Sequence, residues 1–389
     1  MDWHLITCEY PPRVGGVADH TRLVAEGLAA AGDEVHVWCP ADVGEAPESS
    51  EGVRVHAELG RLRPRDLRRA GRALGRFARA RGLLVQWVPH GYGYRSMNVW
   101  FCLWLCARAL LRGDEVALVV HEPFLAFGEG TRRQDAVALV HRLMTVLLLA
   151  SARRVWVTIP KWEECLRPYA LGRSLPFGWL PVPSTTPVLA SAADAAATRA
   201  LYVPAGFRLV GHFGTHGALV APALSRLVPR LLSETDDCAM LLVGRGSEAL
   251  CGEILRTHPR LSGRVHATGT LAPEALSRHL AACDLLVQPY PDGVSARRTS
   301  VMAGLAHGLA VVTTEGRLTE SVWGESGAVR LVEAGDVAGL SGAVRDLLGD
   351  AAARARLGEL ARATYGLHFD LPHLEAKLRQ GCAGLEARG

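Results

Sequence analysis

The sequence lacks an apolar run long enough to cross a lipid bilayer. The longest run that stands out, residues 99–111, is too short to span and is interrupted by Arg108. The first residues, MDWHLITCEYPPR, have neither the basic start nor the cleavage site of a signal peptide and indicate a strand followed by a loop. We therefore expect a cytoplasmic protein, and a peripheral position at the inner face of the membrane is left open.

Three further signatures are missing. The cysteines are scattered, without the spacing of a zinc site or a redox pair. The first strand is not followed by GxGxxG, which disfavours a dinucleotide-dependent dehydrogenase. The net charge of +4 is small for 389 residues, so composition indicates no nucleic-acid partner.

What is present is a repeated alternation of short apolar segments with segments of helical spacing, which predicts an α/β protein with parallel sheets. The predicted strands are residues 3–8, 34–39, 83–88, 116–120, 155–158, 208–214, 240–243, 265–268, 285–289 and 310–314. A chain of 389 residues is too long for one typical core. We therefore expect two Rossmann-like, doubly wound domains facing across a cleft, with ligand loops at the carboxyl ends of their strands.

The domain boundaries follow from changes in composition. Residues 1–182 are the predicted N-terminal domain, and residues 183–205, rich in Pro, Ser, Thr and Ala, are the predicted linker. Residues 206–364 are the predicted C-terminal domain. Residues 365–389 are predicted as C-terminal helices that cross back to the first domain.

The first candidate site is the loop PPRVGGVA. Gly15 and Gly16 lie where a strand ends and a helix begins, so backbone amides and the positive helix end point the same way. This arrangement suits a phosphate or a sugar. The alternative is a tight turn that only links the strand to the helix.

His121 is the second candidate. It directly follows an apolar strand, at the edge of the sheet where ligands bind. An imidazole there can donate or accept a hydrogen bond, and an imidazolium could meet a phosphate. A hydrogen-bonded structural histidine is the alternative.

The third candidate is the first strand-to-helix turn of the second half, which contains Gly214, Thr215 and His216. Its small residues permit close approach to a phosphate. A plain helix-entry turn would explain them equally well.

The fourth candidate is the loop 289–300, which joins a strand to a helical segment. Its polar residues are Asp292, Ser295, Arg297, Arg298, Thr299 and Ser300. Thr299 or Ser300 is expected to cap the helix, and two guanidinium groups beside its positive end would form a diphosphate cradle. The alternative is a pair of surface arginines.

An arginine cluster occupies residues 61–81, with Leu67, Leu74 and Phe77 as its apolar positions. The favoured interpretation is a solvated surface helix. The other is a basic helix that meets anionic lipid or a phosphate-bearing acceptor.

Taken in order, these motifs resemble glycosyltransferase family 4. The likeness covers almost the whole chain and adds LLVGRGS at 241–247, ATGTLAPEALSRHLAACDLLVQPY at 267–290 and LAHGLAVVTT at 305–314. The resemblance implies a GT-B fold, retention of anomeric configuration, and a nucleoside-diphosphate sugar as co-substrate, with neither a further cofactor nor an essential metal.

The resemblance also implies roles for individual residues. Gly15 and Gly16 would contact the phosphates or sugar of the donor, and His121 would position that sugar or its phosphate. Gly214 would flank the diphosphate, with Gly244 nearby in LLVGRGS. The nucleobase would lie along Gly269, Thr270 and Leu271.

The sequence departs from the family pattern in two places. The family has an arginine and a lysine shortly after the first strand of the second domain, where this chain has Thr215 and His216. We expect Arg297 and Arg298 to replace that charge. The family also has two glutamates eight positions apart; the second falls near Ala303, and Asp292 stands in for the first.

The predicted function is transfer of a sugar from a nucleoside-diphosphate sugar to an acceptor hydroxyl. Polysaccharide, glycolipid and small-metabolite acceptors remain open. The alternatives are a nucleotide-sugar 2-epimerase, which would act without an acceptor, and a non-catalytic nucleotide-sugar-binding module of the same fold.

Overall fold

The computed structural model describes the chain except for residues 14, 41–49, 78–80, 94–95, 129–130 and 387–389, and the side chains of 382–386. Val14 of the first candidate loop and Arg79 of the arginine cluster therefore lie outside the described residues. The chain divides into two compact units, which we call unit 1 (Met1–Val182 with Leu371–Gly389) and unit 2 (Pro183–Asp370).

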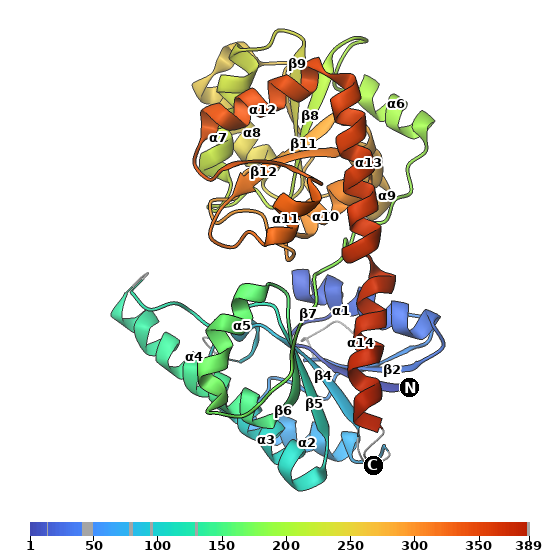
Figure 1. Ribbon diagram of the computed structural model, residues 1–389, viewed down its shortest axis with the longest axis vertical. Helices are drawn as coiled ribbons and strands as arrows, with labels where there is room; N and C mark the ends of the chain where they lie inside the picture. The colour runs from blue at the N-terminus through green and yellow to red at the C-terminus, as the bar shows by residue number, and fades with distance from the viewer. Residues whose placement is uncertain (14, 41–49, 78–80, 94–95, 129–130, 387–389) are drawn as a thin grey trace. The chain divides into compact units, whose positions relative to one another are not determined.

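Unit 1 contains a seven-stranded parallel sheet in the order β3-β2-β1-β4-β5-β6-β7 (Figure 1). The strands are β1 (Asp2–Ile6), β2 (Glu34–Trp38), β3 (Val53–His56), β4 (Gly82–Trp87), β5 (Glu115–Val120), β6 (Ala152–Val157) and β7 (Phe177–Trp179). The helices are α1 (Gly16–Ala30), α2 (Pro64–Leu74), η1 (Pro89–Gly91), α3 (Val99–Arg112), α4 (Arg132–Ser151), α5 (Pro160–Leu166), η3 (Arg167–Ala170) and α14 (Leu371–Glu386).

The two faces of this sheet are covered by different helices. Leu5 and Val37 share a buried core with Leu28 of α1 and Leu374 of α14, so these two helices cover one face. Helices α2, α3 and α4 form a continuous layer on the other face, where α3 packs against both neighbours. The last helix of the chain therefore completes the core of unit 1.

Unit 2 contains a six-stranded parallel sheet in the order β10-β9-β8-β11-β12-β13. The strands are β8 (Arg208–Phe213), β9 (Cys238–Val243), β10 (Val265–Ala267), β11 (Leu285–Gln288), β12 (Ala310–Glu315) and β13 (Arg330–Glu333). The helices are α6 (Ala192–Ala200), α7 (Ala221–Ser233), α8 (Ser247–Thr257), η4 (Pro259–Leu261), α9 (Pro273–Ala281), α10 (Thr299–Ala306), α11 (Ser321–Ser326), α12 (Val337–Gly349) and α13 (Ala351–His368).

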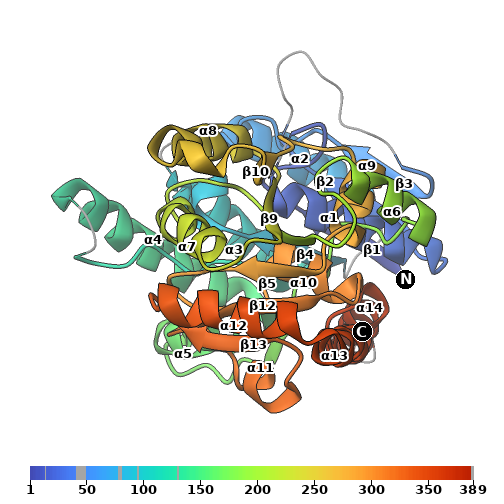
Figure 2. The ribbon, with the colours of Figure 1, turned by 90° about the horizontal axis from the view of Figure 1, so that it is seen from above.

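The helices of unit 2 lie on both faces of its sheet. Helices α7, α8 and α12 pack together on one face, and α10 and α13 pack together on the other (Figure 2). Both units are thus doubly wound α/β structures, which confirms the predicted fold class.

Three strands were absent from the prediction, namely β3, β7 and β13. Each is an edge strand of its sheet, only three or four residues long, and most of its residues are partly exposed. An edge strand pairs on one side and needs no continuous apolar run, so the pattern that identifies buried strands does not detect it.

Residues 183–205, the predicted linker, pack on unit 2. Helix α6 lies against α9, and Arg199 Nη2 is 2.8 Å from Asp284 Oδ2. At the other end of the chain, α13 continues to His368, and unit 1 resumes at Leu371.

Among the described residues, α4 is long and apolar enough to cross a membrane, so the expectation from the sequence that no apolar run has this length was wrong. Length and composition alone also fit a core helix of a soluble protein. One side of α4 is indeed buried, through His141, Met144 and Leu148 among others.

Candidate active site

The candidate site in unit 2 lies where the strand order reverses. β8 pairs with β9 on one side and with β11 on the other, so the chain winds in opposite directions from this point. In open parallel sheets, ligands bind at the carboxyl ends of the strands at such a switch point. Gly214 follows β8 there, and the loop 289–298 follows β11.

Three of the predicted glycines line this edge of the sheet. The Gly214 amide donates to the Val243 carbonyl oxygen at 3.0 Å, and the Gly244 amide donates to the Gly269 carbonyl oxygen at 3.1 Å. Gly244 has a φ of +115°, and a Cβ atom there would lie 2.3 Å from the Gly214 carbonyl oxygen. Only glycine fits at this position, and the backbones of three loops can therefore meet without intervening side chains.

The structure brings together the two arginines and the aspartate of the loop after β11. Arg298 Nη2 lies 2.5 Å from Asp292 Oδ1, and Arg297 Nη2 lies 3.4 Å from Asp292 Oδ2. The Arg298 guanidinium also lies over the Tyr290 ring, 4.5 Å from its centroid. One carboxylate thus holds two guanidinium groups, and this cluster of three residues carries one net positive charge.

Helix α10 begins beside this cluster. Its N-cap is Arg298, which makes no side-chain capping hydrogen bond, so the expectation that Thr299 or Ser300 caps the helix was wrong. The Ser300 hydroxyl instead lies 2.7 Å from the Tyr290 hydroxyl. Since no side chain caps this helix, its first amides and its positive end remain suited to an anion.

Ser300 also connects the two sides of the switch point. Its Oγ lies 3.8 Å from the position that a Cβ atom on Gly214 would occupy. Gly214 and the start of α10 are therefore neighbours, as a shared ligand site requires.

Two histidines at the end of β8 do not supply positive charge. His216 Nε2 is 2.9 Å from His212 Nδ1, and burial lowers the pKa of both rings, for His212 well below its ordinary value. Both imidazoles are then neutral near pH 7. Thr215 beside them is exposed. The guanidinium groups after β11 supply positive charge to this edge, and the exposed Arg245, which directly follows Gly244, is a further cation there.

Thr270 and Leu271 follow β10, two strands away from β8 at the same edge of the sheet. Thr270 is exposed and Leu271 is partly exposed, whereas Gly269 is buried and donates its amide to Ser247 Oγ at 3.0 Å. The structure thus leaves these two side chains accessible at the rim.

Glu320, which the sequence did not single out, stabilises the loop 289–298 that carries the two arginines. Its carboxylate accepts hydrogen bonds from the Ala296 amide at 2.9 Å and from Trp323 Nε1 at 2.7 Å. Ser295, next to Ala296, is fully buried, and its hydroxyl has no partner among the described residues. No sequence motif surrounds Glu320, so its supporting role is recognised only from its contacts in the folded structure.

Burial raises the pKa of Glu320 to about 7 from an ordinary value of 4.5. Because its pKa is raised, the Glu320 carboxyl binds a proton more tightly in the folded state than in the unfolded state. Protonation of Glu320 therefore stabilises the fold, fully below pH 4.5 and no longer once the pH has risen through about 7. The loss amounts to on the order of 3 kcal/mol of the free energy of unfolding.

We therefore expect Glu320→Gln to flatten the dependence of stability on pH. Urea unfolding of the wild type and the variant between about pH 5 and pH 8 measures this difference. Glu325→Gln, which changes an exposed carboxylate on α11, the helix that begins directly after Glu320, is the matched control. Parallel profiles for Glu320→Gln and the wild type would show that Glu320 does not titrate in this range.

In unit 1, His121 directly follows β5 and is buried, with 9% of its surface exposed. Its Nε2 lies 2.8 Å from Gln86 Oε1, and because an amide oxygen only accepts, this contact places a proton on Nε2. The His20 ring packs edge-on at 5.0 Å, and burial lowers the pKa of His20 to about 4, so this neighbour is neutral. Gln86 thus fixes the orientation of His121.

The glycine loop of unit 1 holds a carboxylate of the chain itself. Glu9 Oε1 accepts hydrogen bonds from the amides of Val17 and Ala18, at 3.1 and 3.2 Å, in the first turn of α1. A Cβ atom on Gly15 would lie 2.2 Å from the same oxygen, whereas Gly16 has open space around it. The helix end expected to face a ligand anion is therefore occupied by Glu9, an acidic residue that stands in the same strand-to-helix loop.

The described parts of the chain contain no group of three or more His, Cys, Asp or Glu side chains that could hold a metal ion.

Comparison with known proteins assigns each unit a family domain. Residues 14–174 match the profile described as Glycosyltransferase Family 4, and residues 210–350 match that described as Glycosyl transferases group 1. No curated protein matches the chain.

Solved structures of the same fold cover nearly the whole chain. Sucrose-phosphate synthase from Thermosynechococcus elongatus is 20% identical, with a TM-score of 0.75 and 100% of each chain covered. HepE from Anabaena in complex with UDP is 15% identical, with a TM-score of 0.69 and coverage of 99% and 100%. WaaG, a glycosyltransferase involved in lipopolysaccharide biosynthesis, is 16% identical, with a TM-score of 0.64 and coverage of 97% and 98%.

Proposed function

The chain belongs to the glycosyltransferases of the GT-B type, and we propose that it transfers a sugar from a nucleoside-diphosphate sugar to an acceptor hydroxyl with retention of configuration. Its family 4 domain is followed by a group 1 domain. The observation that carries this proposal is the cluster of Arg297, Arg298 and Asp292 at the uncapped start of α10.

The chemistry of transfer explains why such a cluster is needed. Negative charge develops on the leaving diphosphate while the sugar becomes oxocarbenium-like. Fixed guanidinium groups and helix amides stabilise that charge without reorganising during the reaction. In our proposal the leaving phosphate takes the proton of the acceptor hydroxyl, and no protein carboxylate acts as nucleophile.

His121 acts on the donor sugar or its phosphate in this proposal. Gln86 holds its ring in one orientation, which prepares a positioned donor or acceptor rather than a mobile one. Gly214, Gly244 and Gly269 provide the open backbone edge along which the nucleotide lies.

A uridine nucleotide is the first donor to test, since structures of HepE contain UDP, UDP with glucose, and UDP-glucose. The acceptor class remains a polysaccharide, a glycolipid or a small metabolite. We propose a cytoplasmic location, where nucleotide sugars are made.

The test is a thermal-shift screen with UDP, other nucleoside diphosphates and their sugars, followed by a transfer assay on acceptor mixtures. A ligand that binds only the folded state, present at a free concentration of 100 times its Kd, adds about 2.7 kcal/mol to the free energy of unfolding and so raises the melting temperature. We expect a shift with a diphosphate, release of that diphosphate only with an acceptor, and an α-to-α or β-to-β product by NMR. An inverted product would refute retention. An epimer formed from donor alone, or binding without transfer or donor hydrolysis, would refute the transferase assignment.

A further inference from the structure

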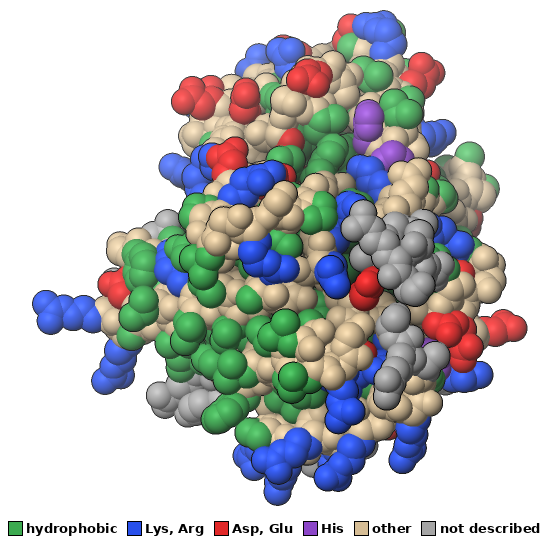
Figure 3. Space-filling view, turned by 60° about the horizontal axis from the view of Figure 1, so that its bottom comes forward, with side chains coloured by type: hydrophobic (Ala, Val, Ile, Leu, Met, Phe, Trp, Pro, Cys, Tyr) green, Lys and Arg blue, Asp and Glu red, His purple; other side chains and the backbone are tan. Residues whose placement is uncertain are grey.

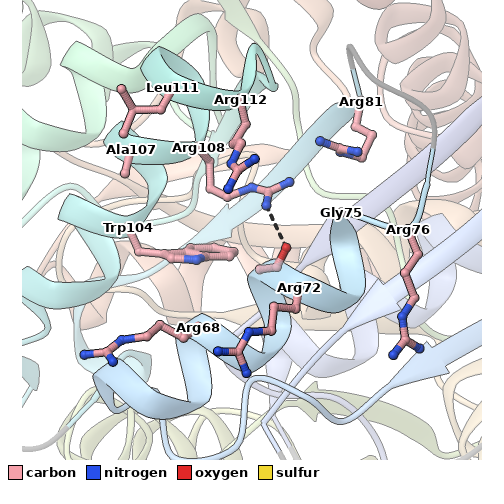
Figure 4. Close-up of a pocket in the computed structure, with 11 residues that line it drawn as sticks. Arg68, Arg72, Gly75, Arg76, Arg81, Trp104, Ala107, Arg108, Leu111 and Arg112 are labelled. Atoms are coloured by element: carbon pink, nitrogen blue, oxygen red, sulfur yellow. Dashed lines mark hydrogen bonds between the residues drawn. The ribbon is translucent and has the colours of Figure 1, made fainter.

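Unit 1 contains an arginine-lined pocket between α2 and α3, separate from the residues assigned to sugar transfer. Its volume is about 690 Å³ (Figure 4). Its lining includes the arginines Arg68, Arg72, Arg76, Arg81, Arg108 and Arg112. A pocket with this lining is suited to an anion.

Only part of this positive charge is neutralised. Arg81 and Arg108 share the buried carboxylate of Asp114, with Arg81 Nη2 2.7 Å from Asp114 Oδ1. The other four lining arginines are exposed and have no acidic partner in the part of the chain that the structure describes; they are Arg68, Arg72, Arg76 and Arg112. We call these four residues the free arginines.

The close approach of α2 to α3 builds the pocket floor. Arg108 Nη1 donates to the Gly71 carbonyl oxygen at 2.9 Å, the contact marked in Figure 4. A Cβ atom on Gly71 would lie 3.1 Å from Trp104 Nε1, so glycine lets α3 approach this turn of α2. Arg68 and Arg72 lie four residues apart on one side of α2, and Arg76 follows in the turn after the helix ends.

An exposed apolar ridge continues from the pocket along α3. Trp100, Leu103, Leu110 and Leu111 are exposed by 62%, 42%, 77% and 80%, and their spacing of three, seven and one residues places them on one stripe of the helix. Leu111 lines the pocket as well. The same helix therefore carries both the apolar ridge and part of the cationic pocket.

Helix α4 extends the ridge. It packs beside α3, where Cys106 Sγ donates to the Leu147 carbonyl oxygen at 3.0 Å, and it exposes Leu139 by 64% and Leu143 by 51%. In Figure 3, hydrophobic side chains gather on one face of the molecule, with Lys and Arg side chains around their margin. Exposed large apolar side chains in contiguous patches indicate an interaction surface.

We propose that this face of unit 1 docks on a bilayer that contains anionic phospholipid. The arginine pocket takes a headgroup phosphate, and the apolar ridge of α3 and α4 enters the interfacial region of the lipid. A surface that combines an apolar stripe with adjacent basic side chains has the chemistry of interfacial binding, in which buried apolar area and attraction to anionic lipid add together.

The charge distribution favours a membrane over a second copy of the chain. A two-fold interface buries the same patch of both subunits, so it would enclose the free arginines of both copies, which have no acidic partner among the described residues. The buried side of α4, through Met144 and Leu148, belongs to the protein core. The contact is therefore peripheral, with α4 lying on the bilayer rather than crossing it.

The test uses the full chain and co-sedimentation with phosphatidylcholine vesicles, with and without phosphatidylglycerol. We expect binding to the anionic vesicles that weakens as sodium chloride is added. The triple variant Arg68→Ala/Arg72→Ala/Arg76→Ala should lose roughly 100-fold in affinity, since each arginine near an anionic surface contributes about fivefold. Leu110→Ser/Leu111→Ser should also weaken binding to the anionic vesicles.

Matched controls lie on unit 2. Arg256→Ala/Arg260→Ala and Leu201→Ser/Leu367→Ser remove exposed side chains of the same kinds and should leave vesicle binding unchanged. Unaltered thermal unfolding of each variant shows that it folds. This inference does not depend on the proposed transfer reaction, because vesicle binding is measured without any sugar.

Three results would overturn the proposal. The triple variant could bind anionic vesicles as tightly as the wild type. Inorganic phosphate could raise the melting temperature of the wild type but not of the triple variant while no vesicle binds, which would assign the pocket to a soluble phosphate. The chain could also dimerise in the ultracentrifuge through a contact that Leu110→Ser/Leu111→Ser abolishes, which would assign the ridge to a second copy.

Discussion

Replacement of both Arg297 and Arg298 by alanine is expected to weaken nucleoside-diphosphate binding by at least about 100-fold, because each charge-assisted hydrogen bond to a phosphate contributes about 1.5–3 kcal/mol. The loss has a second source in this chain. The two guanidinium groups hold the carboxylate of Asp292, and their removal leaves a negative charge at the place where the diphosphate should bind. Isothermal titration calorimetry with UDP measures the effect.

The variant Arg297→Ala/Arg298→Ala/Asp292→Asn, called the triple variant in this paragraph, separates these two sources of lost affinity. If the arginines bind the phosphates directly, the triple variant regains only the part of the affinity that was lost to repulsion by Asp292. Full recovery of wild-type affinity would mean that the arginines only neutralise Asp292, and the cradle would be refuted. Arg256→Ala/Arg260→Ala, at two exposed positions of unit 2, is the control and should bind UDP normally.

The sequence located this loop but could not give its internal geometry. An apolar strand followed by Arg297, Arg298 and a helical segment is visible in the order of residues, and it places the loop at the edge of the sheet. The pairing of both arginines with Asp292 depends on the path of the loop between them. Capping was mispredicted for the same reason: a hydroxyl beside a helix start normally caps it, but the Tyr290 hydroxyl engages Ser300 across ten residues.

The supporting residues show the same limit. Glu9, Gln86 and Glu320 act through contacts with backbone or side chains that are brought near by folding, and none stands in a recognisable motif. Glu9 is the clearest case. The sequence predicts a helix end open to an anion after Gly16, and the structure shows that a carboxylate eight residues before Val17 already accepts its amides. Composition and periodicity describe elements, whereas such contacts are tertiary.

Buried strands were predictable because burial on both faces requires a continuous apolar run. β5 and β9 are both of this kind, with five of six and six of six residues buried. The layer of α2, α3 and α4 was less predictable. An arginine-rich segment alone fits a solvated helix, and only the packing of α2 on α3 shows that its arginines line a pocket.

The second large effect is a loss of transfer rate when His121 is replaced. In the structure, the His121 ring is held in one orientation, and this orientation rather than a charge is its distinguishing feature. Gln86 Oε1 accepts from Nε2, so the imidazole has one tautomer and one ring plane. If His121 acts on the donor sugar, its removal should affect transfer. The arginines and glycines to which we assign the UDP part of the donor belong to unit 2 and should be unaffected. Replacement of Gln86 should also lower the transfer rate, but by less, because it removes only the hydrogen bond that orients the His121 ring.

We therefore expect His121→Ala to lower kcat by about 100-fold or more, as is typical when a positioned catalytic donor is removed, with an unchanged Kd for UDP. Gln86→Ala should lower kcat by about tenfold, the value of one net hydrogen bond. His121→Asn, which keeps a donor near Gln86 in a smaller side chain, controls for the cavity left by alanine. Steady-state transfer rates and UDP calorimetry on the same preparations distinguish the outcomes. A normal kcat in His121→Ala would remove this histidine from the reaction, and a parallel loss of UDP affinity would show that unit 1 also supports the nucleotide site.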